Sequence, residues 1–138
     1  MGLKLHAKMF KVAEATSNVS EFPRIQIGAV IARKNNIIAV GVNQTKSHPL
    51  QKKYNQNRFD DKHDTCQHHL HAEMDAISKV KNPEDFERAT IYVYRKNLNG
   101  ELAMSKPCEA CMTKIIETGI KKIGYTTNQG FAIEYIRV

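Results

Sequence analysis

The sequence predicts an α/β protein, in which a mixed five-stranded sheet lies between helices as a three-layer α/β/α sandwich. Stretches with apolar residues at helical spacing alternate with short runs rich in β-branched and aromatic residues, as expected where helices connect the strands of one sheet. The chain has 138 residues, of which 41% are hydrophobic and 25% are charged. This size and composition are typical of one globular domain, so we expect residues 1–138 to form a single domain.

The first half of the chain is expected to form a helix and a β-hairpin. Apolar residues recur at helical spacing over residues 3–17, which predicts an amphipathic helix. Two dense apolar runs, residues 25–32 and 37–42, flank a polar turn at 34–36 and predict a pair of buried strands. Residues 43–70 are polar and show no clear period. We expect a long loop there, and loops of such length inside a domain are usually functional or mobile.

The second half of the chain is expected to alternate helices and strands. Pro83 stops the first of these helices, and Gly119 ends the second in the manner of a helix C-terminus. Only residues 127–130 separate the last two strands, which is too few for a crossover helix, so we expect those strands to be antiparallel. The predicted elements are helix 71–81, strand 89–95, helix 108–118, strand 121–126 and strand 131–136.

Charge and hydropathy exclude some classes of protein. The chain carries 21 Lys and Arg against 14 Asp and Glu, a formal net charge of +7, which favours an anionic partner. No segment is a dense basic stripe, so a nucleotide phosphate suits this charge at least as well as a long nucleic acid. The longest apolar stretch, residues 27–32, is too short to span a bilayer, and the N-terminal segment lacks the apolar core of an export signal. We therefore expect a cytoplasmic protein that does not enter the membrane.

Two short segments carry residues that bind metals and move protons. His-Ala-Glu at residues 71–73 opens one predicted helix, and Pro-Cys-Glu-Ala-Cys at residues 107–111 opens the next. One imidazole and two thiolates are three protein ligands for zinc and leave a fourth tetrahedral position open, as in a catalytic site. Glu73 can approach a water at that position and move its protons without being a ligand. The predicted metal ligands are His71, Cys108 and Cys111.

The cysteines also allow other interpretations. A Cys-x-x-Cys pair by itself is more often part of a structural zinc ribbon or a redox site. A ribbon needs a second cysteine pair, and only Cys66 remains; a redox pair would follow the first strand, whereas this pair lies late in the chain. Cys66, His63 and His68 could hold a second metal ion. Alternatively, the histidines of this loop contact the sugar or phosphate of a substrate, or are simply polar loop residues, and Cys66 is a free thiol.

The motifs resemble those of the cytidine and deoxycytidylate deaminase superfamily of zinc enzymes. The resemblance rests on His-Ala-Glu-Met-Asp-Ala-Ile at residues 71–77 and on Ser-Lys-Pro-Cys-Glu-Ala-Cys-Met at residues 105–112. Residues 24–31 resemble the Arg-x-x-Val-Gly-Ala-Val-Ile segment of deoxycytidylate deaminases, and residues 41–43 resemble their Gly-Tyr-Asn. The order of these segments follows the family along nearly the whole chain. The resemblance implies the cytidine deaminase-like sandwich fold and hydrolytic loss of ammonia from a cytosine ring.

The same resemblance implies roles for individual residues. The three ligands named above would bind one zinc ion per chain, and Glu73 would be the proton shuttle. The backbone around Ala72 would meet the pyrimidine carbonyl, and Asn43 would contact the base or sugar. Arg24 has the family's support as a phosphate-binding residue. Small deaminases of this family generally self-associate, so we also expect a homo-oligomer.

Other residues bear on the substrate through their position alone. Lys46 and His48 follow the Gly-Val-Asn segment and are further candidates for the phosphate, although each would otherwise be an ordinary solvated surface group. Tyr54 and Phe59 lie among basic residues of the long loop and are the best candidates for stacking on nucleic-acid bases. A lid over a mononucleotide would use the same kinds of residue.

We expect dCMP as the substrate, with three alternatives. The short connection between the last two strands resembles free-nucleoside cytidine deaminases, but those enzymes typically have a cysteine in place of His71. A deaminase acting on cytosine or adenine in single-stranded nucleic acid is supported by the net charge and the long loop. A non-catalytic zinc-binding scaffold is the third, and the carboxyl of Glu73 argues against it.

Overall fold

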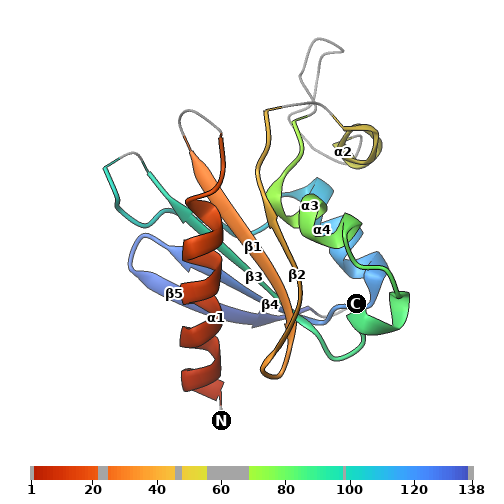
Figure 1. Cartoon of the computed structure of the whole chain (residues 1–138), viewed down its shortest axis with the longest axis horizontal. Coiled ribbons are helices and arrows are strands. Elements are labelled where there is room, and N and C mark those ends of the chain that lie inside the picture. Colours follow the sequence, from red (N-terminus) through yellow and green to blue (C-terminus); the bar gives the residue numbers. More distant parts are fainter. Residues whose placement is uncertain (1, 22–24, 46–47, 56–68, 98, 137–138) are drawn as a thin grey trace.

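The computed structural model describes residues 2–21, 25–45, 48–55, 69–97 and 99–136 of the chain (Figure 1). The elements, in order, are helix α1 (Gly2–Ser17), strands β1 (Gln26–Arg33) and β2 (Asn36–Val42), helices α2 (Pro49–Asn55) and α3 (Ala72–Ser78), the 3-10 helix η1 (Pro83–Phe86), strand β3 (Thr90–Lys96), helix α4 (Glu109–Thr118), and strands β4 (Lys122–Thr127) and β5 (Gly130–Tyr135). All five predicted strands are present, which confirms the predicted α/β class.

The strands form one mixed sheet in the order β2-β1-β3-β4-β5. Strand β1 is antiparallel to both β2 and β3, whereas β3 and β4 are parallel. Helix α4 makes the crossover between the two parallel strands, because parallel neighbours need a long connection. Strands β4 and β5 are antiparallel, as the short connection between them predicted.

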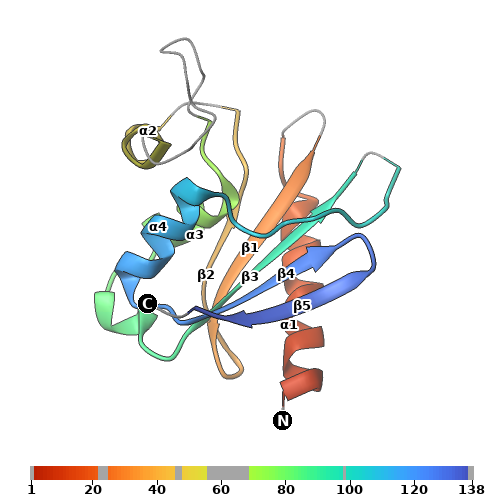
Figure 2. The same cartoon turned by 180° about the vertical axis from the view of Figure 1, so that it is seen from behind.

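The two faces of the sheet are covered by different helices. Successive side chains of a strand point to opposite faces, so each central strand contributes to two core clusters. Val30 and Tyr92 pack with Met9 of α1 on one face, while Ile31 packs with Ile115 of α4 on the other. Figures 1 and 2 show α1 on one side of the sheet and α3 and α4 on the opposite side. This arrangement is the predicted three-layer α/β/α sandwich.

Helix α2 corrects the prediction of a continuous loop between residues 43 and 70. Leu50 and Tyr54 are its apolar residues at helical spacing, and two residues alone do not make a recognisable period. Gln51 and Asn55 are buried on the same helix although both are polar. Hydropathy therefore gave no sign of this helix.

Helix α3 is shorter than the predicted helix over residues 71–81. His71 is its N-cap residue and Lys79 its C-cap residue, and η1 then begins at Pro83.

None of the helices in the described part of the chain is long and apolar enough to cross a membrane.

Close backbone contacts bring α3 against the sheet. A Cβ atom at Gly41 of β2 would overlap backbone atoms of Ala72 and Ala76, so this position requires glycine. Asp75 of α3 adds a polar tie, because its carboxylate accepts a hydrogen bond of 2.9 Å from the backbone N–H of Val42. These contacts fix the start of α3, where His71 and Glu73 lie, relative to β2.

Candidate active site

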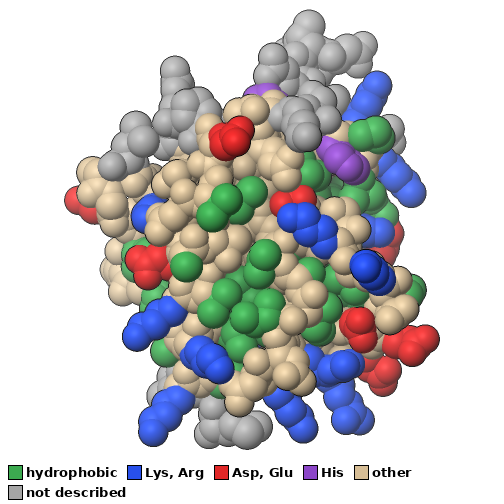
Figure 3. All heavy atoms as spheres, in the orientation of Figure 1, with side chains coloured by type: hydrophobic (Ala, Val, Ile, Leu, Met, Phe, Trp, Pro, Cys, Tyr) green, Lys and Arg blue, Asp and Glu red, His purple; other side chains and the backbone are tan. Residues whose placement is uncertain are grey.

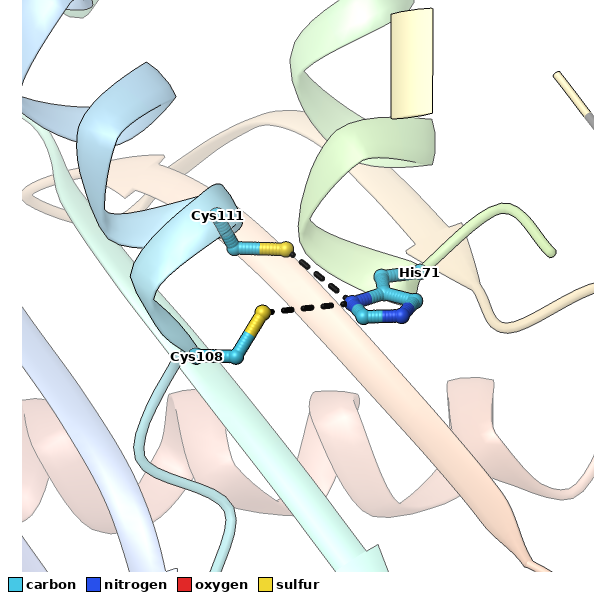
Figure 4. Close-up of side chains that lie close together, drawn as sticks. All are labelled: His71, Cys108 and Cys111. Atoms are coloured by element: carbon cyan, nitrogen blue, oxygen red, sulfur yellow. Dashed lines mark hydrogen bonds between the residues drawn. The ribbon is translucent and has the colours of Figure 1, made fainter. Parts of the chain in front are cut away.

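The three predicted metal ligands lie together where two helices begin. His71 is the N-cap residue of α3, and Cys108 is the N-cap residue of α4. The Nδ1 atom of His71 lies 3.3 Å from Cys111 Sγ and 3.6 Å from Cys108 Sγ. Figure 4 shows the imidazole and the two thiols pointing toward one another from the two helices. Among the described residues, this group has donor atoms within 4.8 Å of one another and could hold a metal ion.

The chemistry of this donor set fits zinc. The hydrogen bond between the two thiols lowers the pKa of Cys108 to about 4 and, together with burial, raises the pKa of Cys111. Cys108 is therefore the thiol that ionises more readily, and metal binding displaces the protons that the two thiols still carry. Zinc prefers sulfur and nitrogen ligands, and three of them from the protein leave a fourth position for water or substrate.

Glu73 brings a carboxyl group to the same place. It lies in the first turn of α3 and is 5% exposed. Burial raises the pKa of this carboxyl, while the charge of His71 acts in the opposite direction. A carboxyl whose pKa is raised toward neutrality is better matched to proton transfer in both directions.

A cavity of about 360 Å³ opens beside these groups. Its volume falls within the range of sites for small ligands. It joins the ends of β1 and β3 to the first residues of α3 and the segment that leads into α4. The lining residues are Ile25, Ile27, Asn43, His69, Leu70, His71, Glu73, Val93, Arg95, Met104, Ser105, Lys106 and Cys108.

Asn43, a predicted substrate contact, lies in the wall of this cavity and is 6% exposed. Its Oδ1 atom accepts hydrogen bonds from the backbone N–H of Ile27 at 2.9 Å and from the Ser20 hydroxyl at 2.5 Å. Its Nδ2 atom donates a hydrogen bond of 2.7 Å to the backbone oxygen of Ile25. Asn43 therefore fixes the entry to β1, and its contact with a base or sugar stays a prediction.

None of the other predicted substrate contacts is among the described residues that line this cavity. Ala72 is fully buried as the first residue of α3, next to His71. His48 lies at the start of α2, where its Nδ1 atom accepts a hydrogen bond from the backbone N–H of Leu50, and it does not line the cavity. Arg24 and Lys46 lie outside the described residues. Cys66, His63 and His68, the candidates for a second metal site, also lie outside them, as does the stacking candidate Phe59.

Several residues of the site were missed by the sequence analysis. Arg95 and Ser105 line the cavity from β3 and from the segment before α4. The strand pattern offered a signal for Arg95, because it lies two positions after Val93 and so shares its face of the sheet. Gln51 of α2 is fully buried, and its Oε1 atom accepts a hydrogen bond of 3.0 Å from the backbone N–H of His71. No local pattern marked this glutamine.

Replacement of Gln51 is expected to weaken metal binding. Gln51→Ala leaves the partly buried backbone N–H of His71 without this acceptor, at a typical cost of about 1–3 kcal/mol. We expect zinc affinity to fall by about 10- to 100-fold, the usual effect of removing a group that orients a metal ligand. Competition with a chromogenic chelator measures the affinity. Lys52→Ala, an exposed position of the same helix, is the matched control, and equal affinities in the two variants would refute the positioning role.

Comparison with protein families and curated relatives agrees with these motifs. Residues 3–127 match the family model described as the cytidine and deoxycytidylate deaminase zinc-binding region. The chain is 33% identical over 122 residues to an uncharacterized deaminase in the luxG 3′ region of Aliivibrio fischeri, covering 84% of this chain and 68% of that protein. It is 30% identical over 131 residues to a probable deoxycytidylate deaminase of Caenorhabditis elegans, covering 92% of this chain and 59% of that protein. The chain thus spans less than two thirds of the nematode relative.

Solved structures share the fold at lower sequence identity. The dCMP deaminase of cyanophage S-TIM5, in complex with dCMP and dUMP, superposes with a TM-score of 0.58 at 22% identity, over 91% of this chain and 82% of that one. The cytidine deaminase of Burkholderia pseudomallei gives a TM-score of 0.60 at 16% identity, over 94% of this chain and 91% of that one. These structural similarities support the fold. The family match covers residues 3–127 and therefore includes both metal-binding motifs. The chain belongs to the cytidine and deoxycytidylate deaminase family and has its zinc-binding region.

Proposed function

We propose that this protein deaminates dCMP to dUMP, with release of ammonia. The observation that carries the proposal is the position of Glu73, which lines the same cavity as the metal ligands His71 and Cys108. A metal site that only stabilises the fold has no use for a carboxyl group in an adjoining cavity. The site therefore supports an enzyme rather than a zinc-binding scaffold.

The residues of the site account for each proton of the reaction. When bound, zinc supplies Lewis-acid activation of a water molecule. Glu73 accepts one proton as the water oxygen attacks C4 of the cytosine ring, and it delivers that proton to ring N3. The second proton of the water passes through Glu73 to the amino group, which leaves as ammonia. C4 keeps the oxygen as a carbonyl, so dCMP and water give dUMP and ammonia.

A nucleotide is supported over a nucleoside by charge and by the relatives. Lys106 adds a cationic side chain to the cavity wall, and the chain carries a net charge of +7. The cyanophage neighbour is described in complex with dCMP and dUMP, and the nematode relative is named a probable deoxycytidylate deaminase. Self-association, which the family resemblance implies, stays a prediction.

Single-stranded nucleic acid is a weaker candidate for the substrate. Tyr54, which the sequence analysis selected for base stacking, is 4% exposed and donates its hydroxyl hydrogen to Glu117. Its ring is therefore not presented to a base as we predicted. On the face seen in Figure 3, the Lys and Arg side chains of the described residues are separated by acidic, apolar and other groups rather than gathered into one stripe. Neither feature resembles a groove that follows a polynucleotide backbone.

A substrate comparison tests this proposal directly. Zinc-loaded protein is incubated with dCMP, deoxycytidine and a cytosine-containing single-stranded oligonucleotide, and mass spectrometry measures uracil formation. We expect kcat/KM for dCMP to exceed that for deoxycytidine by at least about tenfold, the value of one charge-assisted hydrogen bond to phosphate. Conversion of the oligonucleotide alone, with a steep loss in added salt, would overturn the proposal. A lack of conversion of dCMP would overturn it as well.

A further inference from the structure

Arg95 projects into the cavity from the face of the sheet that carries the metal site. On β3 it follows Ile91 and Val93 at alternate positions, and both of these belong to the core cluster beneath α3 and α4. Arg95 accordingly lines the cavity together with His71 and Glu73. A guanidinium group therefore adjoins the groups assigned to metal binding and proton transfer.

The guanidinium of Arg95 is incompletely hydrogen-bonded within the described part of the chain. Its Nε atom is buried and has no hydrogen-bond partner among the described residues. The described residues form the ion pairs Arg33–Asp85, Lys79–Asp75 and Lys106–Glu134, and Arg95 takes part in none of these. Buried polar groups in folded proteins are nearly always hydrogen-bonded. The exception here belongs to a residue that lines the cavity.

The backbone of Arg95 is hydrogen-bonded at both its N–H and its carbonyl oxygen. Its N–H donates a hydrogen bond of 3.2 Å to Thr126 Oγ1, and its carbonyl oxygen accepts one of 3.1 Å from the N–H of Ala103. The Thr126 hydroxyl in turn donates to the carbonyl oxygen of Ala103 at 2.6 Å. Ser105, between Ala103 and the ligand Cys108, donates its hydroxyl hydrogen to β3 at the Val93 carbonyl oxygen. The strand that presents Arg95 is thus tied to the segment that leads to a metal ligand.

The other cations of the cavity wall are less available to an anion. The Nζ atom of Lys106 lies 3.0 Å from Glu134 Oε1, so a carboxylate already partly neutralises its charge. Glu73 is the acidic side chain among the described lining residues. It forms no ion pair with Arg95 or with any other described residue. Arg95 is consequently the cation in this wall that has no carboxylate partner among the described residues.

We infer that Arg95 binds the phosphate of the substrate and so makes the enzyme prefer a nucleotide over a nucleoside; this inference rests on the proposed function. A guanidinium presents N–H donors in a planar fork that matches two phosphate oxygens at once. The phosphate contacts predicted from the sequence, Arg24, Lys46 and His48, belong to other segments of the chain.

The test compares the phosphorylated and unphosphorylated substrates in variants of this arginine. Arg95→Gln is expected to lower kcat/KM for dCMP by about 10- to 100-fold and to change kcat/KM for deoxycytidine by less than about threefold. Arg95→Lys keeps the charge but loses the fork, so its loss on dCMP should be intermediate. Arg33→Gln, an arginine paired with Asp85 outside this cavity, is the matched control and should behave as wild type. Zinc content and Tm are measured for every variant.

The outcomes separate this inference from the proposed function. Equal losses on dCMP and deoxycytidine, or no loss on dCMP, would overturn the role of Arg95. If Arg95→Gln does not fold or loses zinc, Arg95→Lys is used in its place. A larger loss of kcat/KM on dCMP than on deoxycytidine then supports the role of Arg95, and equal losses overturn it. If wild-type protein converts neither substrate, the proposed function fails, and calorimetric binding of dUMP and deoxyuridine replaces turnover. Weaker dUMP binding in Arg95→Gln than in Arg33→Gln would still support the phosphate site, and equal binding would overturn it.

Discussion

Glu73→Gln is expected to abolish nearly all deamination while the protein keeps its zinc. The amide has almost the same shape as the carboxyl group but cannot accept the proton of the attacking water. Positioned general acid–base groups contribute about 10²- to 10⁴-fold to rates, so we expect kcat on dCMP to fall by that factor. Turnover is measured by mass spectrometry and zinc by elemental analysis of the same samples.

The control for this variant replaces a nearby acidic residue that does not line the cavity. Glu109 is exposed in the first turn of α4 and does not line the cavity, so Glu109→Gln should keep most of the activity. Wild-type turnover in Glu73→Gln would contradict the proton-shuttle role. Loss of zinc together with activity would instead indicate that the carboxyl group is a metal ligand.

Loss of a metal-binding thiol is expected to remove zinc and to lower stability. In Cys111→Ser the hydroxyl group cannot replace a thiolate, and the imidazole and one sulfur remain. A metal present at about 1,000 times its Kd stabilises a fold by about 4 kcal/mol. In chains of similar size, each kcal/mol of lost stability lowers Tm by about 2–4 °C. The variant should therefore unfold about 8–16 °C below the zinc-loaded wild type. Calorimetry measures Tm, and elemental analysis measures zinc.

Two comparisons make this result specific. Chelator-treated wild type should unfold at nearly the same temperature as Cys111→Ser, because both lack the ion. Cys66→Ser should keep both zinc and Tm if Cys66 is a free thiol. An undiminished zinc content in Cys111→Ser would contradict the assigned ligands, and zinc loss in Cys66→Ser would indicate that the second metal site exists.

The metal ligands could be predicted because each motif contains its own local geometry. Cys108 and Cys111 are one helical turn apart at the start of α4, so both thiols lie at the same end of that helix. His71 and Glu73 likewise belong to the start of α3. What joins the two helix ends is the sheet, whose strand order brings α3 and α4 onto one face. Hydropathy periods predicted those strands well.

Other residues of the site were beyond such local patterns. The burial of Gln51 and its hydrogen bond to His71 depend on contacts between segments far apart in the chain. Helix α2 was missed for the same reason, since its buried positions include polar residues that no hydropathy pattern selects. Tyr54 illustrates the opposite error, because a residue in a polar segment was expected to be exposed and is buried instead.

The sequence by itself determined the order of the five strands and of helices α1, α3 and α4, the antiparallel last pair of strands and the residues positioned to bind a metal. These follow from periodicity, loop length and motif spacing, all of which are properties of neighbouring residues. Only the tertiary structure decided that Gln51 holds the backbone of His71 and that Arg95 lines the cavity beside Glu73. The physical reason is that burial and hydrogen-bond partners of a polar side chain depend on which distant segments pack around it.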